Sequence, residues 1–185
     1  MKKKSGILFI SCCIVAAAFF SAVYSSCNRD QCKSIVCANN GVCNRGECIC
    51  PTGYGGTNCE TVLRQKFLGK WTVFEKGSTT VQAQYPITIK EGQRITDVQI
   101  VNFNNQFKTN VIATVGGQNG DSLFITDQQV QDKFVLGVGY IATSTTYGQF
   151  GTISMRYEVI DSATDIINDY GYYLPDLSAA SVWNK

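Results

Sequence analysis

Hydrophobic and polar side chains alternate along much of the chain after residue 66. Three stripes show this alternation most clearly. Their apolar members are Val81, Ala83, Tyr85, Ile87 and Ile89; Phe134, Leu136, Val138, Tyr140 and Ala142; and Ile153, Met155, Tyr157 and Val159. Successive side chains of a β-strand point to opposite faces, so the alternation predicts strands with each stripe facing the core.

Turn-forming residues divide this region at intervals of roughly 12 to 16 residues. They are Gly77, Gly92, Asn104–Asn105, Gly116–Gly120, Asp132, Gly148 and Asp161. About eight strands are expected, the last over Ile166–Tyr173, with no helical stretch of useful length. Pro86 cannot donate a ladder hydrogen bond and marks an edge or a bulge. Short connections favour an up-and-down meander that closes into a barrel, so the predicted fold is an all-β, antiparallel barrel over residues 67–185.

The N-terminus has the organisation of a secretory signal peptide. Lysines at positions 2 to 4 precede the apolar run Ile7–Val23, and small residues follow it. A membrane-spanning helix is the alternative, but the run is at the short end for spanning and polar residues follow at once. Residues 1–26 are therefore expected to be removed on export.

Ser25, Ser26 and Cys27 resemble a bacterial lipobox, in which the cysteine is acylated and becomes the first mature residue; Tyr24 departs from the usual aliphatic. Cysteine parity supports this, because six of the seven cysteines from Cys27 onward fit a disulfide framework and the seventh needs a role. The resemblance implies a lipoprotein held by acyl (palmitate-type) chains on Cys27, with residues 27–31 as the tether. The expected location is the outer membrane or cell surface of a Gram-negative bacterium.

Six cysteines crowd into residues 32–59, and no cysteine follows. The closing pattern, from Cys50 through Gly53, Tyr54 and Gly56 to Cys59, resembles an EGF-like domain. That resemblance implies the pairing Cys32–Cys43, Cys37–Cys48 and Cys50–Cys59. So short a segment cannot bury a sufficient core, so crosslinks must stabilise it. A zinc site is the rival interpretation, but an exported chain without histidine disfavours it.

Many EGF-like domains bind calcium, and Asn28, Asp30 and Gln31 resemble half of that pattern. The second half is missing, so a structural spacer is favoured and no metal is expected. Residues 60–66 are expected to be a short linker.

Gly69 and Trp71 resemble the Gly-x-Trp start of lipocalin-like (calycin) domains. In that family an arginine on the last barrel strand packs over the tryptophan, and Arg156 is the candidate for that role. Trp71 could equally be an ordinary core aromatic.

Charge and composition narrow the function. The 16 basic and 14 acidic residues nearly balance, which disfavours nucleic acid as a partner, and histidine is absent. The carboxylates considered for catalysis mostly neighbour turns, where aspartate caps backbone groups. They are Asp97, Asp121, Asp127, Asp161, Asp165 and Asp169. Neither an enzyme nor a cofactor is expected.

The preferred hypothesis is a binding or interaction module for an unknown small apolar ligand, glycan or protein; the alternative is a structural surface protein with the EGF-like unit as a stalk. An open interior would give a pocket formed by Tyr85, Gly137, Gly139, Tyr140, Met155 and Tyr157. A filled interior is favoured, because close packing is the default. Recognition would then fall to loops such as Gly116–Asp121 and Thr143–Gln149.

Overall fold

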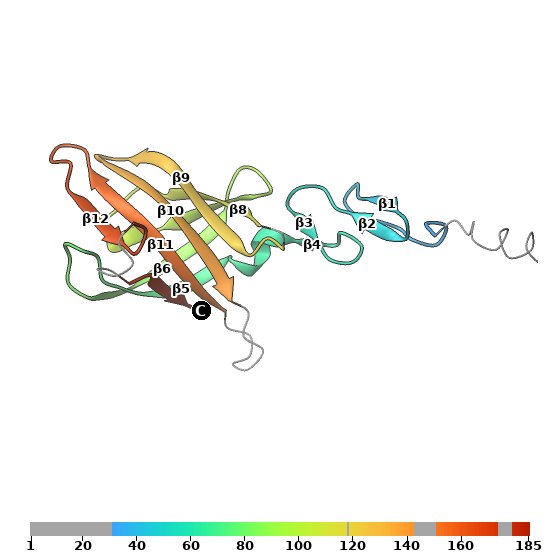
Figure 1. Ribbon diagram of the computed structural model, residues 1–185, viewed down its shortest axis with the longest axis horizontal. Helices are drawn as coiled ribbons and strands as arrows, with labels where there is room; N and C mark the ends of the chain where they lie inside the picture. Colours follow the sequence, from blue (N-terminus) through green and yellow to red (C-terminus); the bar gives the residue numbers. More distant parts are fainter. Residues whose placement is uncertain (1–30, 118, 143–150, 174–178) are drawn as a thin grey trace, which may run out of the picture.

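The computed structural model describes residues 31–117, 119–142, 151–173 and 179–185. Within these ranges the chain is all-β, with a disulfide-rich N-terminal module followed by a closed antiparallel barrel of eight strands (Figure 1). The predicted fold class is confirmed. No helix of the described ranges combines the length and the hydropathy needed to cross a bilayer.

Eight strands close the barrel in the order β5-β6-β7-β8-β9-β10-β11-β13, and β13 returns to β5. Their bounds are β5 Gly69–Glu75, β6 Ala83–Glu91, β7 Asp97–Val101, β8 Val111–Gly116, β9 Ser122–Val130, β10 Lys133–Ala142, β11 Thr152–Asp161 and β13 Ser181–Asn184. A short 3-10 helix, η2 (Phe103–Asn105), lies between β7 and β8.

The last part of the meander differs from the sequence prediction. The expected final strand, over Ile166–Tyr173, is the short β12 (Ile167–Tyr170), which pairs only with the C-terminal half of β11. The strand that closes the barrel is β13, which pairs with the N-terminal half of β11 and with β5. Four residues carry too little periodicity to be recognised from sequence, yet without β13 the barrel would have two open edges.

Pro86 lies in β6, an inner strand of the closed barrel, at a point where only one side of the strand is paired. It pairs with Thr72 of β5, whereas the pairing of β6 with β7 begins only at Thr88. The missing amide hydrogen of Pro86 therefore leaves no gap in a ladder.

The stripe on β10 faces outward, contrary to the prediction. Phe134 and Tyr140 are exposed, whereas Val135, Gly137, Gly139 and Ile141 point into the barrel. Both faces of this strand are apolar, so alternation alone cannot choose between them. In the first stripe Val81 and Ala83 are also exposed, because β6 enters the core only at Tyr85.

Side chains fill the barrel interior. The largest of those with less than 2% exposure are Trp71, Trp183, Tyr157, Phe67, Phe103 and Ile87. Gly137 lies opposite Tyr157, and Gly139 lies opposite Met155. A Cβ on Gly137 would come within 2.5 Å of Tyr157 Cβ, and a Cβ on Gly139 within 2.5 Å of Met155 Sδ. The two glycines accommodate large cross-strand partners and do not leave a pocket.

The N-terminal module is held by disulfides. They join Cys32 to Cys43, Cys37 to Cys48 and Cys50 to Cys59, which is the pairing that the EGF-like resemblance implies. Its strands are β1 Val42–Asn44, β2 Glu47–Ile49, β3 Tyr54–Gly55 and β4 Thr61–Val62. Within residues 31–62 only Gly53 and Cys59 are buried, so crosslinks replace a hydrophobic core.

The segment expected to be a linker is structured and packs on the barrel. Strand β4 pairs with β3, and the 3-10 helix η1 (Leu63–Lys66) follows it directly. Arg64 donates hydrogen bonds to the carbonyls of Gly92 and Arg94, in the loop between β6 and β7. The module therefore joins the barrel at the end formed by the loops 92–96 and 117–121.

Candidate functional site

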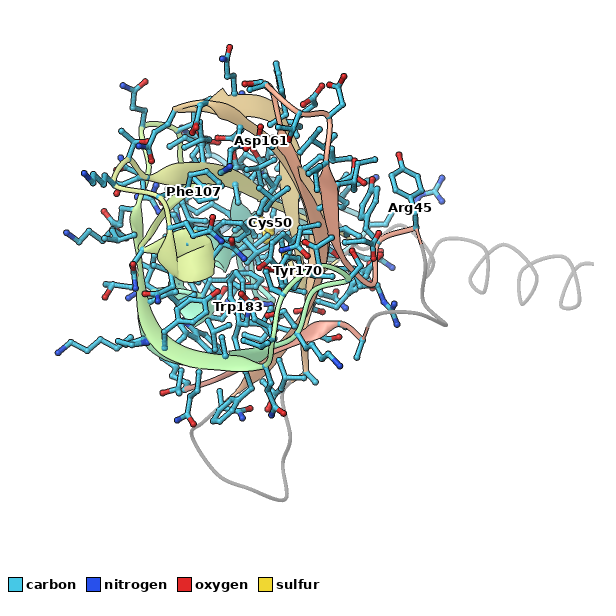
Figure 2. The ribbon with its side chains drawn as sticks, turned by 90° about the vertical axis from the view of Figure 1, so that its left-hand side faces the viewer. Arg45, Cys50, Phe107, Asp161, Tyr170 and Trp183 are labelled. Atoms are coloured by element: carbon cyan, nitrogen blue, oxygen red, sulfur yellow. A yellow bond between two sulfur atoms is a disulfide. The ribbon has the colours of Figure 1, made fainter. Side chains whose placement is uncertain are left out.

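The opposite end of the barrel forms an open mouth, here called the distal mouth. It is bounded by the loops 76–82, 102–110, 131–132 and 162–166. Antiparallel strands place these four loops at the end away from the module (Figure 1). In Figure 2 this end faces the viewer, with Phe107, Tyr170 and Trp183 inside the ring of strands.

Two adjoining hollows occupy the distal mouth, each of about 190 Å³. They share Thr80, Asn104 and Gln106. The first hollow is also lined by Lys133, Asp161, Thr164, Ile166 and Asn168, and the second by Glu75, Val81, Tyr85 and Tyr170. Hydroxyl and amide side chains share the walls with apolar ones, and the second hollow is the more apolar of the two. The exposed aliphatic residues Val81 and Ile166 lie at the rim.

A buried carboxylate, Glu75, lies at the floor. Its Oε1 accepts hydrogen bonds from the Tyr85 hydroxyl and from Asn104 Nδ2, the latter at 3.1 Å. Its Oε2 accepts from the Tyr157 hydroxyl at 2.8 Å and from Ser181 Oγ at 2.6 Å. Four donors occupy the roughly four acceptor positions of a carboxylate. Glu75 is therefore a structural hub that joins β5, β6, η2, β11 and β13, with no lone pair left for a ligand.

The two tyrosines on Glu75 are held in their protonated form. Burial, followed by the charge of Glu75, raises the pKa of Tyr85. Burial is also the first cause that raises the pKa of Tyr157, followed by Tyr85 and Glu75. Both hydroxyls remain donors to the carboxylate over the whole physiological pH range.

Asn104 connects the hub to the hollows. Its Nδ2 also lies 2.7 Å from the Tyr157 hydroxyl and 2.8 Å from the Tyr170 hydroxyl, so two N–H groups are shared among three acceptors. Its Oδ1 accepts from Gln106 Nε2 at 2.8 Å. The backbone of Asn104 is left-handed, with φ 52°, a conformation that asparagine tolerates better than most residues. The η2 turn thus places Phe103 in the core and Asn104 beneath the mouth.

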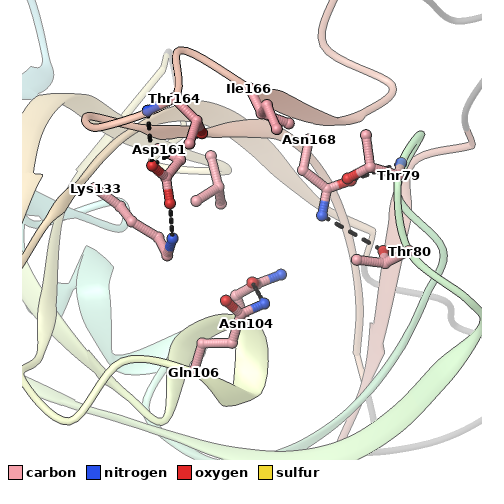
Figure 3. Close-up of a pocket in the computed structure, with 10 residues that line it drawn as sticks. Thr79, Thr80, Asn104, Gln106, Lys133, Asp161, Thr164, Ile166 and Asn168 are labelled. Atoms are coloured by element: carbon pink, nitrogen blue, oxygen red, sulfur yellow. Dashed lines mark hydrogen bonds and ion pairs between the residues drawn. The ribbon is translucent and has the colours of Figure 1, made fainter.

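One ion pair lies at one wall of the first hollow, between paired residues of β10 and β11. Lys133 Nζ lies 2.7 Å from Asp161 Oδ2, on the side facing Asn104 and Gln106 (Figure 3). Asp161 Oδ1 also accepts from the backbone N–H groups of Ala163 and Thr164. The hydrogen bond from Lys133, then those from Thr164 and Ala163, lower the pKa of Asp161 to about 2. Asp161 therefore caps the turn after β11, as the sequence suggested for aspartates near turns.

Polar residues of β12 and of the loop 76–82 form the third wall (Figure 3). Asn168 Oδ1 accepts from the backbone N–H of Thr79 at 3.1 Å, and Asn168 Nδ2 donates to the Tyr170 hydroxyl at 2.8 Å. The bond from Thr79 holds the loop 76–82 against β12, and the bond to Tyr170 orients the Asn168 amide within β12. The exposed groups that remain around the opening include the Thr79 hydroxyl and Gln106 Oε1, for which the described residues show no intramolecular bond.

The six residues that would line a pocket if the interior were open do not form one, and the interior is filled, as the sequence favoured. Tyr85, Met155, Tyr157, Gly137 and Gly139 point inward and are packed. Tyr140 was expected to line the pocket, and this is wrong: it is 55% exposed on the outer face of β10. Only Tyr85 of this set lines a hollow.

The Gly-x-Trp motif lies at the start of β5. Gly69 has a left-handed φ of 117°, and Trp71 is buried with Nε1 donating to the Phe67 carbonyl at 2.7 Å. The cation over Trp71 is Lys185, whose Nζ lies 5.3 Å from the ring. Assignment of that role to Arg156 is wrong, because Arg156 points outward and donates to the Gly171 carbonyl. The sequence offered Arg156 only because the closing strand β13 was missed.

Other expected sites fall outside the described residues. These are the signal peptide, the lipidation site Cys27, the calcium candidates Asn28 and Asp30, and the loop Thr143–Gln149. Gln31 is exposed. The described residues contain no cluster of three or more acidic, cysteine or histidine side chains suited to a metal ion.

Glu75 and the residues around it were not recognised from the sequence. One signal was available, because Trp71, Val73 and Glu75 continue one inward-facing alternation and an acidic residue in such a stripe is unusual. The left-handed asparagines of η2 and the partners on β12 were not predictable, because they depend on how distant loops meet.

No family model matches the chain. The chain is similar to a structural-genomics crystal structure of a protein of unknown function from Bacteroides ovatus, with 9% sequence identity and a TM-score of 0.39. The match covers 63% of this chain and 40% of the Bacteroides ovatus chain. This chain thus matches less than half of the length of that protein.

Proposed function

We propose that the protein is an exported, membrane-anchored binding module that takes a neutral, hydroxyl-rich ligand such as a glycan at its distal mouth. The observation that carries this proposal is that the two adjoining hollows combine threonine, asparagine and glutamine side chains with aliphatic and tyrosine side chains. Hydroxyl and amide groups both donate and accept, as the alternating donors and acceptors of a polyol require.

Charge favours a neutral ligand over an anionic one. The residues that line the hollows include two carboxylates, Glu75 and Asp161, and one ammonium group, Lys133. Their charges sum to one negative charge. The partners of Glu75 are neutral hydroxyls and an amide, so no cation at the floor offsets that charge. Phosphates, fatty acids and acidic sugars would be repelled.

The packed interior disfavours the apolar ligand that the sequence left open. Trp71, Tyr157 and Trp183 occupy the space in which a lipocalin-type ligand would lie. A likeness to lipocalin-like domains is still supported by the buried Trp71 on the first barrel strand and the cation of Lys185 over its ring. We infer that the likeness concerns the architecture and not an internal ligand.

The anchor is part of the proposal. The six cysteines of residues 32–59 pair among themselves, so none of them is a partner for Cys27, and acylation gives that cysteine a role. Disulfides are typical of exported proteins. With the anchor preceding the module, the distal mouth is at the far end of the molecule from the membrane.

A panel of immobilised oligosaccharides tests the binding proposal. The full-length mature protein should bind at least one neutral oligosaccharide of glucose, galactose or mannose, and bind sialylated or sulfated sugars less. Gln106→Ala should weaken binding tenfold or more, because Gln106 Oε1 is available at the opening. The matched control is Gln65→Ala, which removes an exposed glutamine at the opposite end of the barrel.

Failure to bind any sugar of the panel, or equal loss with both variants, would refute recognition at the distal mouth. The structural alternative, a stable surface body on a disulfide stalk, would then be favoured.

A further inference from the structure

Two aliphatic side chains are exposed side by side on the disulfide module. Val42 of β1 and Ile49 of β2 are 66% and 57% exposed. They are directly opposite each other in the antiparallel register, so they share one face of the hairpin. Val36, next to Cys37, is exposed as well. Val42 and Ile49 thus form an adjacent pair of exposed aliphatic side chains on the module.

The hairpin cannot turn this pair inward. Cys43 and Cys48 take the opposite face, and their disulfides to Cys32 and Cys37 fix it toward the rest of the module. A two-stranded hairpin has no second layer in which the pair could be buried. Val42 and Ile49 are therefore open to contact with an external apolar surface.

The length of the tether brings a membrane within reach of the pair. Five peptide units join Cys27 to Cys32, which span at most about 17 Å when extended. Cys32 is bonded to Cys43, with the two Cα atoms 5.8 Å apart, and Val42 adjoins Cys43. Acyl chains on Cys27 would therefore hold the bilayer surface within a short distance of the apolar pair.

The module carries charges of both signs near the pair. Lys33 and Arg45 are exposed, and Glu47 is the only acidic residue between Cys32 and Cys59. Arg45 lies in the turn of the hairpin that carries the pair. Alternation along β2 puts Glu47 on the same face as Ile49, so the charges of the hairpin nearly balance. The attraction of this face to a bilayer therefore rests on its aliphatic side chains.

We propose that Val42 and Ile49 seat the disulfide module on the membrane surface. This seating rests on the acyl anchor proposed above, and it fixes the orientation of the module relative to the membrane. The module then lies in the headgroup region and directs the barrel, with its distal mouth, away from the bilayer.

Quenching of tryptophan fluorescence by brominated lipid tests this seating. The native tryptophans, Trp71 and Trp183, are buried in the barrel and should be unquenched. The lipidated protein carrying Ile49→Trp, in vesicles of phosphatidylethanolamine and phosphatidylglycerol, should lose at least a third of its added emission when brominated chains are used. Val42→Trp, on the same face, is a second probe.

Val81→Trp is the matched control. It replaces an aliphatic residue that is 83% exposed at the distal mouth, and it should show no quenching. If the protein floats with vesicles but neither Ile49→Trp nor Val42→Trp is quenched, the seating is refuted while the anchor stands. If the protein does not float with vesicles at all, both the anchor and the seating are refuted.

Discussion

At the scale of single residues, Glu75 is the side chain on which most of the distal mouth depends. It accepts from four donors that belong to four different elements. Substitution by glutamine keeps the shape of the side chain, but it replaces one carboxylate oxygen with an amide NH2 group. That group is a donor and would face the donors that now bind Glu75. We predict that Glu75→Gln lowers the free energy of unfolding by about 3 kcal/mol, because buried hydroxyls lose their acceptor.

Chemical denaturation measures this loss, and Glu91→Gln is the control. Glu91 forms a surface ion pair with Arg64, and its side chain is 59% exposed. Its substitution should cost less than about 1 kcal/mol. Equal effects of the two substitutions would contradict the role of Glu75 as a hub.

Asp161 makes the stability of the folded protein depend on pH. Its pKa is lowered to about 2 in the folded protein by the hydrogen bonds from Lys133, Thr164 and Ala163, against about 3.9 for an unperturbed aspartate. A lowered folded pKa stabilises the protein above the unfolded pKa, and this contribution is lost as the pH falls toward the folded pKa. Asp161→Asn should therefore lower the Tm at pH 7, and its deficit should shrink between about pH 4 and pH 2. A deficit in Tm that is the same at pH 7 and at pH 2 would show that charge plays no part.

At the scale of elements, strands β10 and β11 determine how the barrel is filled. Gly139 leaves room for the Met155 side chain on the neighbouring strand, because a Cβ on residue 139 would lie 2.5 Å from the Met155 sulfur. We predict that Gly139→Ala destabilises the protein by about 1–3 kcal/mol through overpacking. Met155→Ala removes the sulfur that the new Cβ would meet. The loss of unfolding free energy in the double variant should therefore be smaller than the sum of the losses in the two single variants.

Denaturant titration of the four chains completes this cycle. Strictly additive effects, or a Gly139→Ala variant as stable as the parent, would mean that the interior has spare room. In that case the alternative of an open pocket would have to replace the filled interior that the sequence favoured.

The same strands show what sequence reasoning could and could not provide. Alternation gave the all-β class, the barrel and the inward stripe of β11, because Met155 and Tyr157 stand opposite polar residues. It failed on β10, where both faces are apolar and the cross-strand match of Gly137 and Gly139 with large partners decides the orientation. It missed β13 and the hub around Glu75, because these depend on contacts between segments far apart in the chain.

At the scale of the whole molecule, the junction between module and barrel rests on a close contact. Gly53 has a φ of 90°, and a Cβ there would lie 2.6 Å from Cγ2 of Ile95 in the loop 92–96. We predict that Gly53→Ala loosens the junction and increases tryptic cleavage after Arg64 several-fold, because Arg64 is held by the same loop.

Gly46→Ala separates backbone strain from this contact. Gly46 has nearly the same φ, 89°, but its neighbour is Gln31 of the module at 3.4 Å, and no barrel residue is within reach. It should leave cleavage after Arg64 unchanged. Equal acceleration by both variants would indicate that strain within the module, and not the junction, controls cleavage.

The central claim is that the barrel is a filled body that binds at the mouth directed away from its anchor. The most direct test maps amide chemical shifts of the isotopically labelled protein while the neutral oligosaccharide that binds best on the panel is added. We predict perturbations at Thr79, Gln106 and Asn168, with none at Leu63 or Gln65 at the junction end. Perturbations centred on Gly139 and Met155 in the interior, or on the disulfide module, would contradict this account.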